Sequence, residues 1–368
     1  MTPQHAGPGE NHRYPSEHLR EFTTRVFRHC DVPKTEACQA ADVLSTADLW
    51  GIETHGVARL RAYYEMLAQG HINPRPQIRI VRELPATATI DGDNGLGLVV
   101  GPKANQLALE KADVVGTAWV SVCNSNHFGI AGYYAVQAVA RDMIGWAMTN
   151  TTPQVAPLWG IGRMLGTNPI AVAFPAEPGA PIVIDMATSA ISYGLVENAL
   201  RKEQLVPDRC LIDAAGKPTT DPSEMSRGGA LLPLGGDREH GAHKGYCLNV
   251  MVDLLCGVLS GANWGPFVPP FPRHLPGPER SVGKGIGHLF GAFRIDGFVD
   301  PDSFKRQIVE WIKVFRAAPS VPGTDGPLIP GDPEREAEAV RRREGISLLT
   351  SVIEDLRYIA KRSGVPLD

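Results

Sequence analysis

The chain carries Thr117-Ala118-Trp119-Val120-Ser121-Val122, an apolar β-rich run that passes directly into Cys123-Asn124-Ser125-Asn126-His127-Phe128-Gly129. The run predicts a strand, and the polar residues and glycine after it predict a loop at the carboxyl end of that strand. Ligands of α/β enzymes bind at such ends. An imidazole exchanges protons near neutral pH, so the pattern makes His127 a candidate for proton transfer. A hydrogen-bonded loop histidine without a catalytic role fits the same local sequence.

Composition indicates an ordinary globular protein. With 368 residues the chain exceeds the size at which single cores stop growing, so we expect one large or two intertwined domains. Hydrophobic residues make up 43% and charged residues 21%, which argues against disorder. The net charge of −4 provides no basic field, so neither nucleic acid nor a membrane is expected as a partner.

Three segments and the six cysteines bear on the cellular location and on the surface of the protein. Residues 1–14 are polar and lack the apolar core of a secretory signal, so we expect a flexible tail and a cytoplasmic protein. The six cysteines contain no CxxC pair, as is typical of reduced thiols. The apolar stretch 247–259 is too short to span a bilayer and predicts a buried helix. Arg341-Arg342-Arg343 predicts a solvated helix face.

Helical patterns flank a β-rich middle. Helices are expected over 16–49 with a break at 33–35 and Thr35 as a cap, and over 56–68, 103–112, 193–201, 244–259, 302–315 and 333–362. Strands are expected within 78–90 and over 117–122, 144–149, 169–174, 182–186 and 287–295. This order predicts an α/β protein in which a helical domain, 15–75 together with 300–368, is interrupted by an α/β domain, 76–299.

Thr54-His55-Gly56-Val57-Ala58-Arg59 places a histidine and an arginine four residues apart. On a helix both side chains would lie on the same face. A guanidinium can hold a carboxylate by two hydrogen bonds while the imidazole serves a neighbouring atom. The alternative is a helix-start histidine beside a surface arginine that pairs with Glu65 or Asp48.

Polar residues gather at other predicted element ends. Gly166-Thr167-Asn168-Pro169 precedes a strand, and Asp185-Met186-Ala187-Thr188-Ser189 ends one, where Asp185 could bind a ribose diol. Both fit turns or helix caps equally well. Gly241-Ala242-His243-Lys244-Gly245 begins a helix, where amide groups and Lys244 could hold a phosphate, or where the lysine is simply exposed.

Two glycine-rich segments, 95–101 and 160–166, nearly match a dinucleotide-binding fingerprint. Both lack its spacing and its acidic residue about twenty positions later, so a standard Rossmann site is not expected. His240, His243 and Cys247 do not form a standard zinc ligand set, and no metal is expected.

Several blocks together resemble one family, the malate/L-lactate dehydrogenase-like NAD(P)-dependent oxidoreductases, which include sulfolactate, ureidoglycolate and diketogulonate enzymes and piperideine-carboxylate reductases. The matching blocks are residues 47–60, 124–129, 166–169, 185–189, 243–246 and 330–334, in family order between about residues 15 and 360. The resemblance implies a non-Rossmann NAD(P)-binding domain with a mixed, largely antiparallel sheet, and a helical domain formed by both chain ends. It also implies a homodimer whose partner helps to complete the site.

The resemblance also assigns roles. The implied contacts to NAD or NADP are His127, Phe128, Gly129, Asp185, Met186, Ala187, His243, Lys244, Pro330, Gly331, Asp332 and Glu334. The implied substrate contacts are Thr54, His55, Arg59 and Thr167. Proton transfer falls to the position of His127 in ureidoglycolate enzymes and to that of His55 in imine reductases, and we favour His127 for alcohol oxidation.

These observations predict an oxidoreductase that moves a hydride between NAD(P) and a small 2-hydroxy acid or 2-oxo acid of the malate, lactate, sulfolactate or ureidoglycolate type. One alternative is a reductase of cyclic ketimines (2-imino acids). Leu195 argues against it, because relatives commonly have Lys there, or Asp in the imine reductases, and leucine relays no proton. The other alternative is a catalytically inactive nucleotide-binding homologue.

Overall fold

The computed structural model describes residues 12–176, 180–272 and 277–367. The chain forms two compact units. Unit 1 comprises Met1–Arg75 and Asp332–Asp368, and unit 2 comprises Pro76–Gly331. The expected tail, 1–14, lies mostly outside the described residues, of which 12–14 form a short strand. No helix among the described residues is long and apolar enough to cross a membrane.

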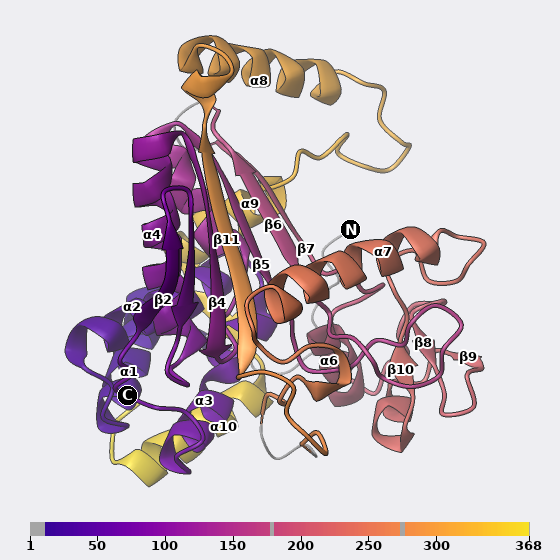
Figure 1. The fold of residues 1–368 in the computed structure, drawn as a ribbon. Helices are drawn as coiled ribbons and strands as arrows, with labels where there is room; N and C mark the ends of the chain where they lie inside the picture. Colours follow the sequence, from indigo (N-terminus) through magenta and orange to yellow (C-terminus); the bar gives the residue numbers. More distant parts are fainter. Residues whose placement is uncertain (1–11, 177–179, 273–276, 368) are drawn as a thin grey trace. The chain divides into compact units, whose positions relative to one another are not determined.

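A seven-stranded sheet forms the centre of unit 2, in the order β2-β3-β4-β11-β5-β6-β7 (Figure 1). Its strands are β2 (Arg79–Leu84), β3 (Thr87–Asp91), β4 (Thr117–Ser125), β11 (Ile286–Arg294), β5 (Met143–Thr149), β6 (Ile170–Phe174) and β7 (Ile182–Met186). Neighbours pair antiparallel except β3 with β4, which are parallel. The predicted α/β class and mixed sheet are confirmed.

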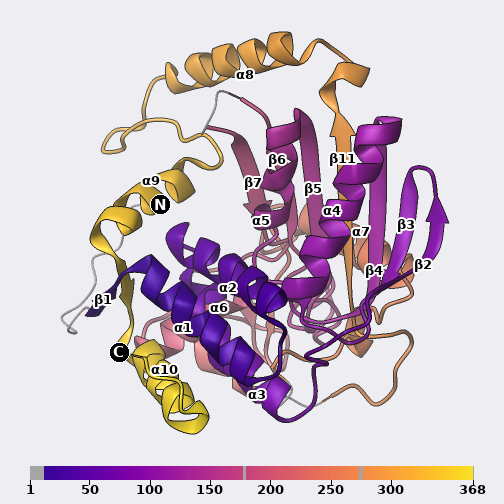
Figure 2. The same ribbon diagram turned by 90° about the vertical axis from the view of Figure 1, so that its left-hand side faces the viewer.

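Helices cover both faces of this sheet (Figure 2). On one face lie α4 (Gly97–Val115) and α5 (Gly132–Ala135), and on the other lies α7 (Ala242–Asp253), which continues into a π-helical turn, Leu254–Val258. Small side chains allow α4 to pack closely, since Ala112 belongs to the same buried cluster as Ala118 and Ala292 of the sheet. Close packing against both faces makes the strand ends rigid platforms for the loops that follow them.

The predicted buried helix over 247–259 is only half buried. Val252 and Cys256 pack against the sheet. Met251, Leu254 and Val258 lie on the opposite side and are exposed. A helix on the outer layer of a sheet buries only one face, and hydrophobicity alone did not show which.

Beyond this sheet, unit 2 contains three further groups of elements. A small three-stranded sheet, β10 (Ala230–Leu231), β8 (Leu211–Ile212) and β9 (Pro218–Thr219), packs with α6 (Tyr193–Arg201). Short 3-10 turns lie at Val136–Arg141, Pro222–Arg227, Gly265–Phe267 and Ile295–Gly297. The last helix of the unit is α8 (Pro301–Arg316).

Unit 1 is helical, and both chain ends contribute to it. Its helices are α1 (Ser16–His29), α2 (Lys34–Leu49), α3 (Leu60–Ala68), α9 (Asp332–Glu344) and α10 (Thr350–Ser363). The strands β1 (His12–Tyr14) and β12 (Ile346–Leu348) pair antiparallel and join the two chain ends. The boundary near residue 75 was expected, but the second one falls after Gly331 rather than at 299, because α8 belongs to unit 2.

Two local predictions in unit 1 are wrong. Thr35 does not cap α2, which begins at Lys34 after Pro33 and has no side-chain cap. The helix expected over 56–68 is interrupted, since 3-10 turns at Glu53–His55 and Val57–Arg59 flank Gly56 and the α-helix starts only at Leu60. His55 and Arg59 therefore do not share one face of a regular helix.

Candidate active site

His127 lies in the loop that follows β4, as predicted, two residues after the strand ends at Ser125. Its ring stacks on Phe271, with centroids 4.6 Å apart and planes 9° from parallel. The backbone N–H of Gly129 donates to Nδ1 over 3.3 Å. This contact favours the neutral tautomer with its proton on Nε2. In that form the ring can donate a hydrogen bond to the oxygen of a 2-oxo acid.

Phe128 occupies a different place from the one its predicted cofactor role suggests. Its ring is fully buried and stacks on His288 and Tyr134, each with centroids 4.8 Å apart. A ring enclosed in this way is not available to a ligand. Any contact that residue 128 makes with a cofactor therefore comes from its backbone.

The glycine-rich segment 95–101, which lacks the spacing of a nucleotide-binding loop, packs against the loop that carries His127. The amide of Asn126 donates to the carbonyl oxygen of Gly95 over 2.9 Å. A side chain at Gly97 would overlap the backbone oxygens of Asn126 and His127. These glycines permit a close approach of two backbones. The missed signal was their spacing at the start of a helix.

Replacing Gly97 with alanine is expected to displace the Asn126–His127 backbone, because a methyl group there has no room. Overpacking of this kind costs about 1–3 kcal/mol of folding free energy. Turnover and the midpoint of urea unfolding should both fall. Gly162→Ala is the matched control, since nothing lies within 4 Å of a Cβ at that position. Equal behaviour of the two variants would contradict the packing role of Gly97.

Thr167 lies in a tightly held turn before β6. The hydroxyl of Thr151 accepts the N–H of Thr167 over 3.0 Å. The side chain of Asn168 accepts the N–H of Thr151 and donates to Asn249 on α7, over 3.1 and 2.7 Å. Neither Thr151 nor Asn249 was predicted from the sequence as a site residue. Thr151 follows the strand β5 by two residues, and that position was the available signal.

The structure brings together three further predicted segments of unit 2. Asp185 on β7 accepts the N–H of Gly132, three residues beyond Gly129, over 2.7 Å. Val183 on the same strand donates to the carbonyl oxygen of Pro330 over 3.1 Å. Gly129, Asp185 and Pro330 thus belong to one connected region, and Met186 ends its edge strand. Asp332 and Glu334 lie in unit 1, in the first turn of α9, where Asp332 forms an ion pair with Arg335.

Lys244 and His243 lie in the first turn of α7, after Gly241 in the left-handed conformation with φ 103°. Arg238 donates to Nδ1 of His243 over 2.9 Å. Lys244 is exposed. Basic side chains at a helix start suit the diphosphate of a dinucleotide, and a carboxylate such as Asp185 suits a ribose diol. These residue types therefore fit NAD(P).

In unit 1, Thr54, His55 and Arg59 lie on the two 3-10 turns. Nδ1 of His55 is 2.9 Å from the hydroxyl of Thr54. Nε of Arg59 donates to the carbonyl oxygen of Thr54 over 2.8 Å. Burial of the ring and the charge of the nearby Arg59 guanidinium lower the pKa of His55 to about 3. His55 is therefore neutral at physiological pH.

Asp48 of α2 holds the second of these turns by a hydrogen bond to its backbone. Its Oδ2 accepts the N–H of Val57 over 2.9 Å, while its buried Oδ1 has no hydrogen-bond partner among the described residues. Arg341 donates to the carbonyl oxygen of Asp48 over 2.6 Å and also bonds Glu53. The predicted solvated face at 341–343 is therefore wrong for Arg341. Burial raises the pKa of Asp48 to about 7, despite the Val57 hydrogen bond and the Arg341 charge.

Replacing Asp48 with asparagine is expected to stabilise the protein at pH 8. The pKa is raised from 3.8 to about 7 on folding, so the folded state binds more protons and loses stability as pH rises through that window. The neutral amide avoids this loss, by on the order of 2–4 kcal/mol at pH 8. Urea unfolding at pH 5 and pH 8 measures the free energy of unfolding of each variant. Asp42→Asn is the control, because Asp42 is a more exposed carboxylate of the same helix. A similar destabilisation at both pH values would contradict a raised pKa of Asp48 in the folded protein.

Leu195 lies in the first turn of α6 and packs on a buried apolar cluster that includes Val155 and Val196. The aromatic rings of Tyr193 and Tyr246 pack on the same cluster. Leucine is thus satisfied by apolar packing at this position, and the helix start lacks the charge that the family resemblance placed there.

Comparison with known proteins identifies the class. Residues 14–357 match the family model described as malate/L-lactate dehydrogenase. The chain is 42% identical to the malate dehydrogenase of Pyrococcus horikoshii, covering 96% of each. It is 39% identical to the L-sulfolactate dehydrogenase of Methanocaldococcus jannaschii, covering 96% of this chain and 97% of that protein.

Solved structures agree. The malate dehydrogenase of Pyrococcus horikoshii superposes with a TM-score of 0.89 at 40% identity, covering 100% of this chain and 99% of that one. The malate dehydrogenase of Entamoeba histolytica superposes with a TM-score of 0.91 at 33% identity, covering 97% of this chain and 99% of that one. The protein belongs to the malate/L-lactate dehydrogenase family. It is an NAD(P)-dependent oxidoreductase of hydroxy acids.

Proposed function

We propose that this protein catalyses reversible hydride transfer between NAD(P) and the carbinol carbon of a small 2-hydroxy acid of the malate, lactate, sulfolactate or ureidoglycolate type. The observation that carries the proposal is the Thr54–Arg59 turn. There a neutral imidazole and a guanidinium are both anchored on Thr54. A 2-oxo acid presents a carboxylate beside a carbonyl. The guanidinium suits the carboxylate, and the imidazole of His55 is one of two candidates, beside that of His127, to serve the carbonyl oxygen.

Bound NAD(P) supplies the hydride in one direction and accepts it in the other. Lys244 and His243 at the start of α7 would hold its diphosphate, and Asp185 would accept from a ribose hydroxyl. The backbone around Gly129 and the segment at Pro330 would border it. The sheet has only one parallel pair, so we propose that this mode of binding is non-Rossmann.

Arg59 would hold the substrate carboxylate by two parallel hydrogen bonds, with Thr54 and Thr167 as further hydrogen-bonding partners. In the reducing direction C2 of the 2-oxo acid gains the hydride, and its oxygen gains a proton. We assign that proton to His127, with His55 as the alternative. The position of His127 in the loop after β4, two residues before the Gly129 backbone proposed to border NAD(P), supports the assignment. The imidazolium form would give up the proton and be left as a neutral ring.

The test is oxidation of NADH and NADPH by pyruvate, oxaloacetate, sulfopyruvate, oxalurate and piperideine-2-carboxylate, followed by absorbance. We expect turnover with at least one of the four 2-oxo acids and little with the cyclic imine. Turnover with the imine alone would instead support the ketimine reductase. Cofactor binding by calorimetry without turnover on any compound would support the inactive homologue.

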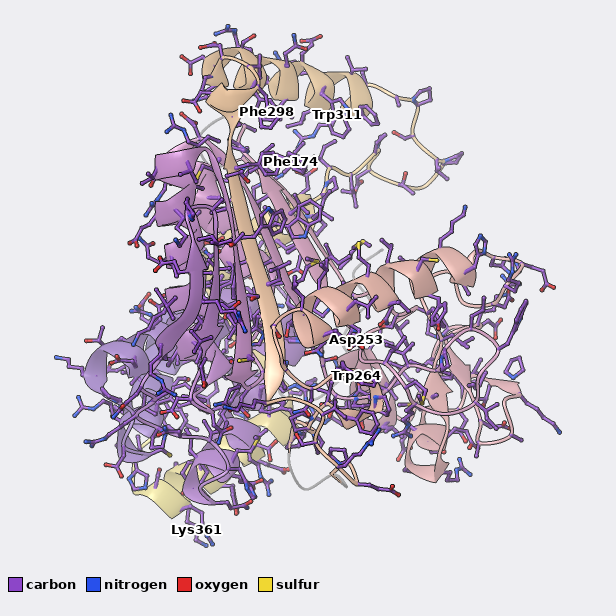
Figure 3. All side chains as sticks on the ribbon, in the orientation of Figure 1. Phe174, Asp253, Trp264, Phe298, Trp311 and Lys361 are labelled. Carbon is purple, nitrogen blue, oxygen red and sulfur yellow. The ribbon has the colours of Figure 1, made fainter. Side chains whose placement is uncertain are left out.

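We further propose that the protein is a cytoplasmic homodimer that uses α8 in its interface. The cytoplasmic location is supported by the six cysteines, none of which forms a disulfide. No residue of α8 is buried, although the helix carries an apolar stripe. Figure 3 shows its Trp311 on the side of the helix that faces Phe174 of the sheet.

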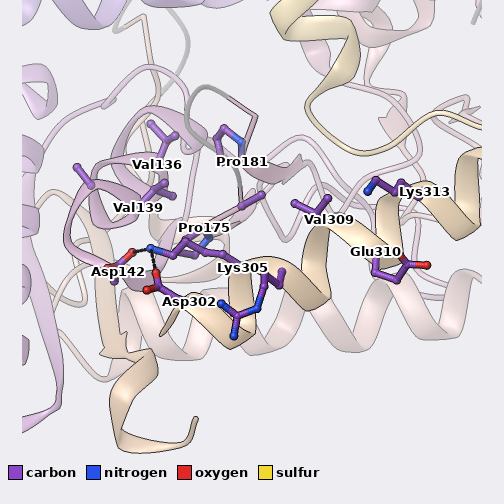
Figure 4. Close-up of a pocket in the computed structure, with 13 residues that line it drawn as sticks. Val136, Val139, Asp142, Pro175, Pro181, Asp302, Lys305, Val309, Glu310 and Lys313 are labelled. Carbon is purple, nitrogen blue, oxygen red and sulfur yellow. Dashed lines mark hydrogen bonds and ion pairs between the residues drawn. The ribbon is translucent and has the colours of Figure 1, made fainter. Parts of the chain in front are cut away.

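Grooves run along both sides of α8. One, of about 560 Å³, is lined mostly by apolar side chains that include Ile184, Ile308 and Trp311. The other, of about 1020 Å³, is more charged, and in it Lys305 bridges Asp142 and Asp302 (Figure 4). An exposed apolar stripe of this kind marks an interaction surface. We propose that a second copy of this chain binds at the apolar groove, because the family resemblance implies a homodimer.

Replacing Val314 with glutamate is expected to shift the protein from dimer to monomer, because it places a charge in the apolar interface. Val314 is 60% exposed, so the fold of one chain should not depend on it. Light scattering after size-exclusion chromatography measures the mass. Val114→Glu, at a valine that is 83% exposed on α4, is the matched control. A Val314→Glu protein that remains dimeric would contradict the use of α8.

A further inference from the structure

His288 is a fully buried histidine on β11, the strand that lies between β4 and β5. Its Nδ1 is 2.7 Å from the hydroxyl of Thr149, the last residue of β5. Its Nε2 is 2.8 Å from the hydroxyl of Ser125, the last residue of β4. One imidazole therefore joins the carboxyl ends of both neighbouring strands. Both ring nitrogens are hydrogen-bonded, which offsets the cost of burying them.

A β-bulge creates this arrangement. His288 pairs with Val122 and Ile286 pairs with Ser125, so two residues of β4, Cys123 and Asn124, face one residue of β11. Asn124 adopts the left-handed conformation with φ 55°. Because side chains alternate along a strand, one extra residue moves Ser125 to the face that His288 occupies. The bulge immediately precedes the loop that carries His127.

On the β4 side, His288 contacts that loop twice. Its ring stacks on Phe128, with centroids 4.8 Å apart and planes 13° from parallel. Ser125, which it bonds, is separated from His127 by a single residue. Phe128 is in turn packed on Tyr134, whose hydroxyl donates to the carbonyl oxygen of Phe128. The backbone on both sides of His127 is therefore anchored to groups that touch His288.

On the β5 side, the connection leads to the turn that carries Thr167. Thr149, which His288 bonds, is followed by Asn150, whose backbone N–H and side-chain oxygen both bond Gly287 of β11. Next comes Thr151, which bonds Thr167 and Asn168. One chain of side-chain contacts from the His127 loop to Thr167 therefore passes through His288.

The protonation state of His288 is fixed by its surroundings. The hydroxyl of Thr149 lies 3.0 Å from the carbonyl oxygen of Gly287, to which it can donate. Nδ1–H then donates to Thr149, and Nε2 accepts from Ser125. Burial lowers the pKa of His288 to about 3. The ring is neutral throughout the physiological range, so these bonds do not change with pH there.

We propose that His288 is a positioning residue that sets the place of the His127 loop relative to Thr167 by holding the bulged end of β4 and the end of β5 together. This inference rests on the proposed function, in which both residues serve the reaction. Misplacement of a reacting group by about 1 Å costs on the order of 10²-fold in rate, so such a link affects turnover without touching substrate.

The test compares His288→Phe with His288→Asn and His288→Gln. Phenylalanine keeps the stacking on Phe128 but makes neither hydrogen bond, and the two hydroxyls retain backbone acceptors, so the variant should fold. We expect kcat to fall about 10- to 100-fold in His288→Phe. The amide of Asn can take the place of Nδ1 and that of Gln the place of Nε2, so each should restore part of this loss.

Two readouts separate positioning from a merely structural role. With 4-deuterated NADH, the isotope effect on kcat should rise in His288→Phe, while the Kd of NADH stays within about threefold, since the phosphate-binding groups are elsewhere. Amide hydrogen exchange should become faster in peptides that cover residues 126–132 and 150–152. Ser121→Ala is the control. It removes a hydroxyl of β4 that is hydrogen-bonded to Thr89 on β3, and it should change neither readout.

A lower melting temperature with an unchanged isotope effect and unchanged exchange would overturn the inference and leave His288 a packing residue. Unaltered turnover in His288→Phe would also overturn it. If the unmodified protein reduces no 2-oxo acid, the proposed function fails, whereas hydrogen exchange at 126–132 still decides the role of His288. Unchanged exchange would then count against it, and faster exchange there would support it.

Discussion

Replacing His127 with alanine is expected to lower kcat for reduction of a 2-oxo acid about 10²- to 10⁴-fold, the usual contribution of a proton-transfer group. The Kd of NADH should change little, because the residue acts on the substrate oxygen rather than on the diphosphate. The structure supports this expectation through the loop after β4, where the ring stacks on Phe271 and receives the Gly129 N–H on Nδ1. Stopped-flow and steady-state kinetics with the same 2-oxo acid measure both quantities.

His29→Ala is a suitable control, since His29 is exposed on α1 and should leave turnover unchanged. His55→Ala, measured in parallel, separates the two candidate imidazoles. Near-normal turnover in His127→Ala together with a large loss in His55→Ala would move the proton-transfer role to His55. In the oxidising direction His55 would then act as a weak base, because its pKa, lowered to about 3, disfavours the protonated ring near pH 7.

The second large effect is expected at Arg59. Arg59→Met should raise the KM of the 2-oxo acid about 100-fold, because hydrogen bonds to a charged group each contribute about 1.5–3 kcal/mol. Arg59→Lys should recover only part of this, since lysine keeps the charge but not the planar fork. Cofactor affinity should stay near normal in both variants.

Because Arg59 also holds the carbonyl oxygen of Thr54, part of the loss can come from a shifted turn. Circular dichroism and the melting temperature of each variant identify that part. Arg28→Met, at an exposed arginine of α1, is the control. An unchanged KM in Arg59→Met would exclude this arginine as the carboxylate-binding group.

Local sequence patterns predicted most of the elements of unit 2. The helix over 193–201 matches α6, and the strands after 117, 144, 169 and 182 are all present. Each has strong periodicity or clear turn residues at its ends, and such signals are local. The family resemblance added the mixed sheet, which no local pattern contains.

What the sequence did not reveal depends on residues far apart in the chain. The break at Gly56 arises where that glycine packs on Asp48, a carboxylate eight positions earlier. The bulge near Asn124 becomes visible only when β11, more than 160 residues later, pairs with β4. The assignment of α8 to unit 2 follows from its contacts and not from its helical pattern. Non-local pairings of this kind leave no mark in the spacing of neighbouring residues.

The same limit applies to the candidate site. Strand-end polarity pointed to His127, Thr167 and Asp185, and the structure places each beside a strand end. It did not reveal that the Phe128 ring is buried, or that Gly97 lies under the loop. Supporting residues such as Asp48 and His288 were not identified as such, because a buried polar residue is recognisable only from its partners.

Isotope transfer tests whether the hydride moves directly between the cofactor and the 2-oxo acid. The protein is incubated with a 2-oxo acid and nicotinamide cofactor deuterated at C4 of the reduced ring, with both faces labelled in separate samples, and the product is analysed by mass spectrometry. Direct hydride transfer predicts a 2-hydroxy acid carrying one deuterium on C2 with one of the two labelled cofactors and none with the other. A product without deuterium from either cofactor, or no 2-hydroxy acid at all, would contradict it.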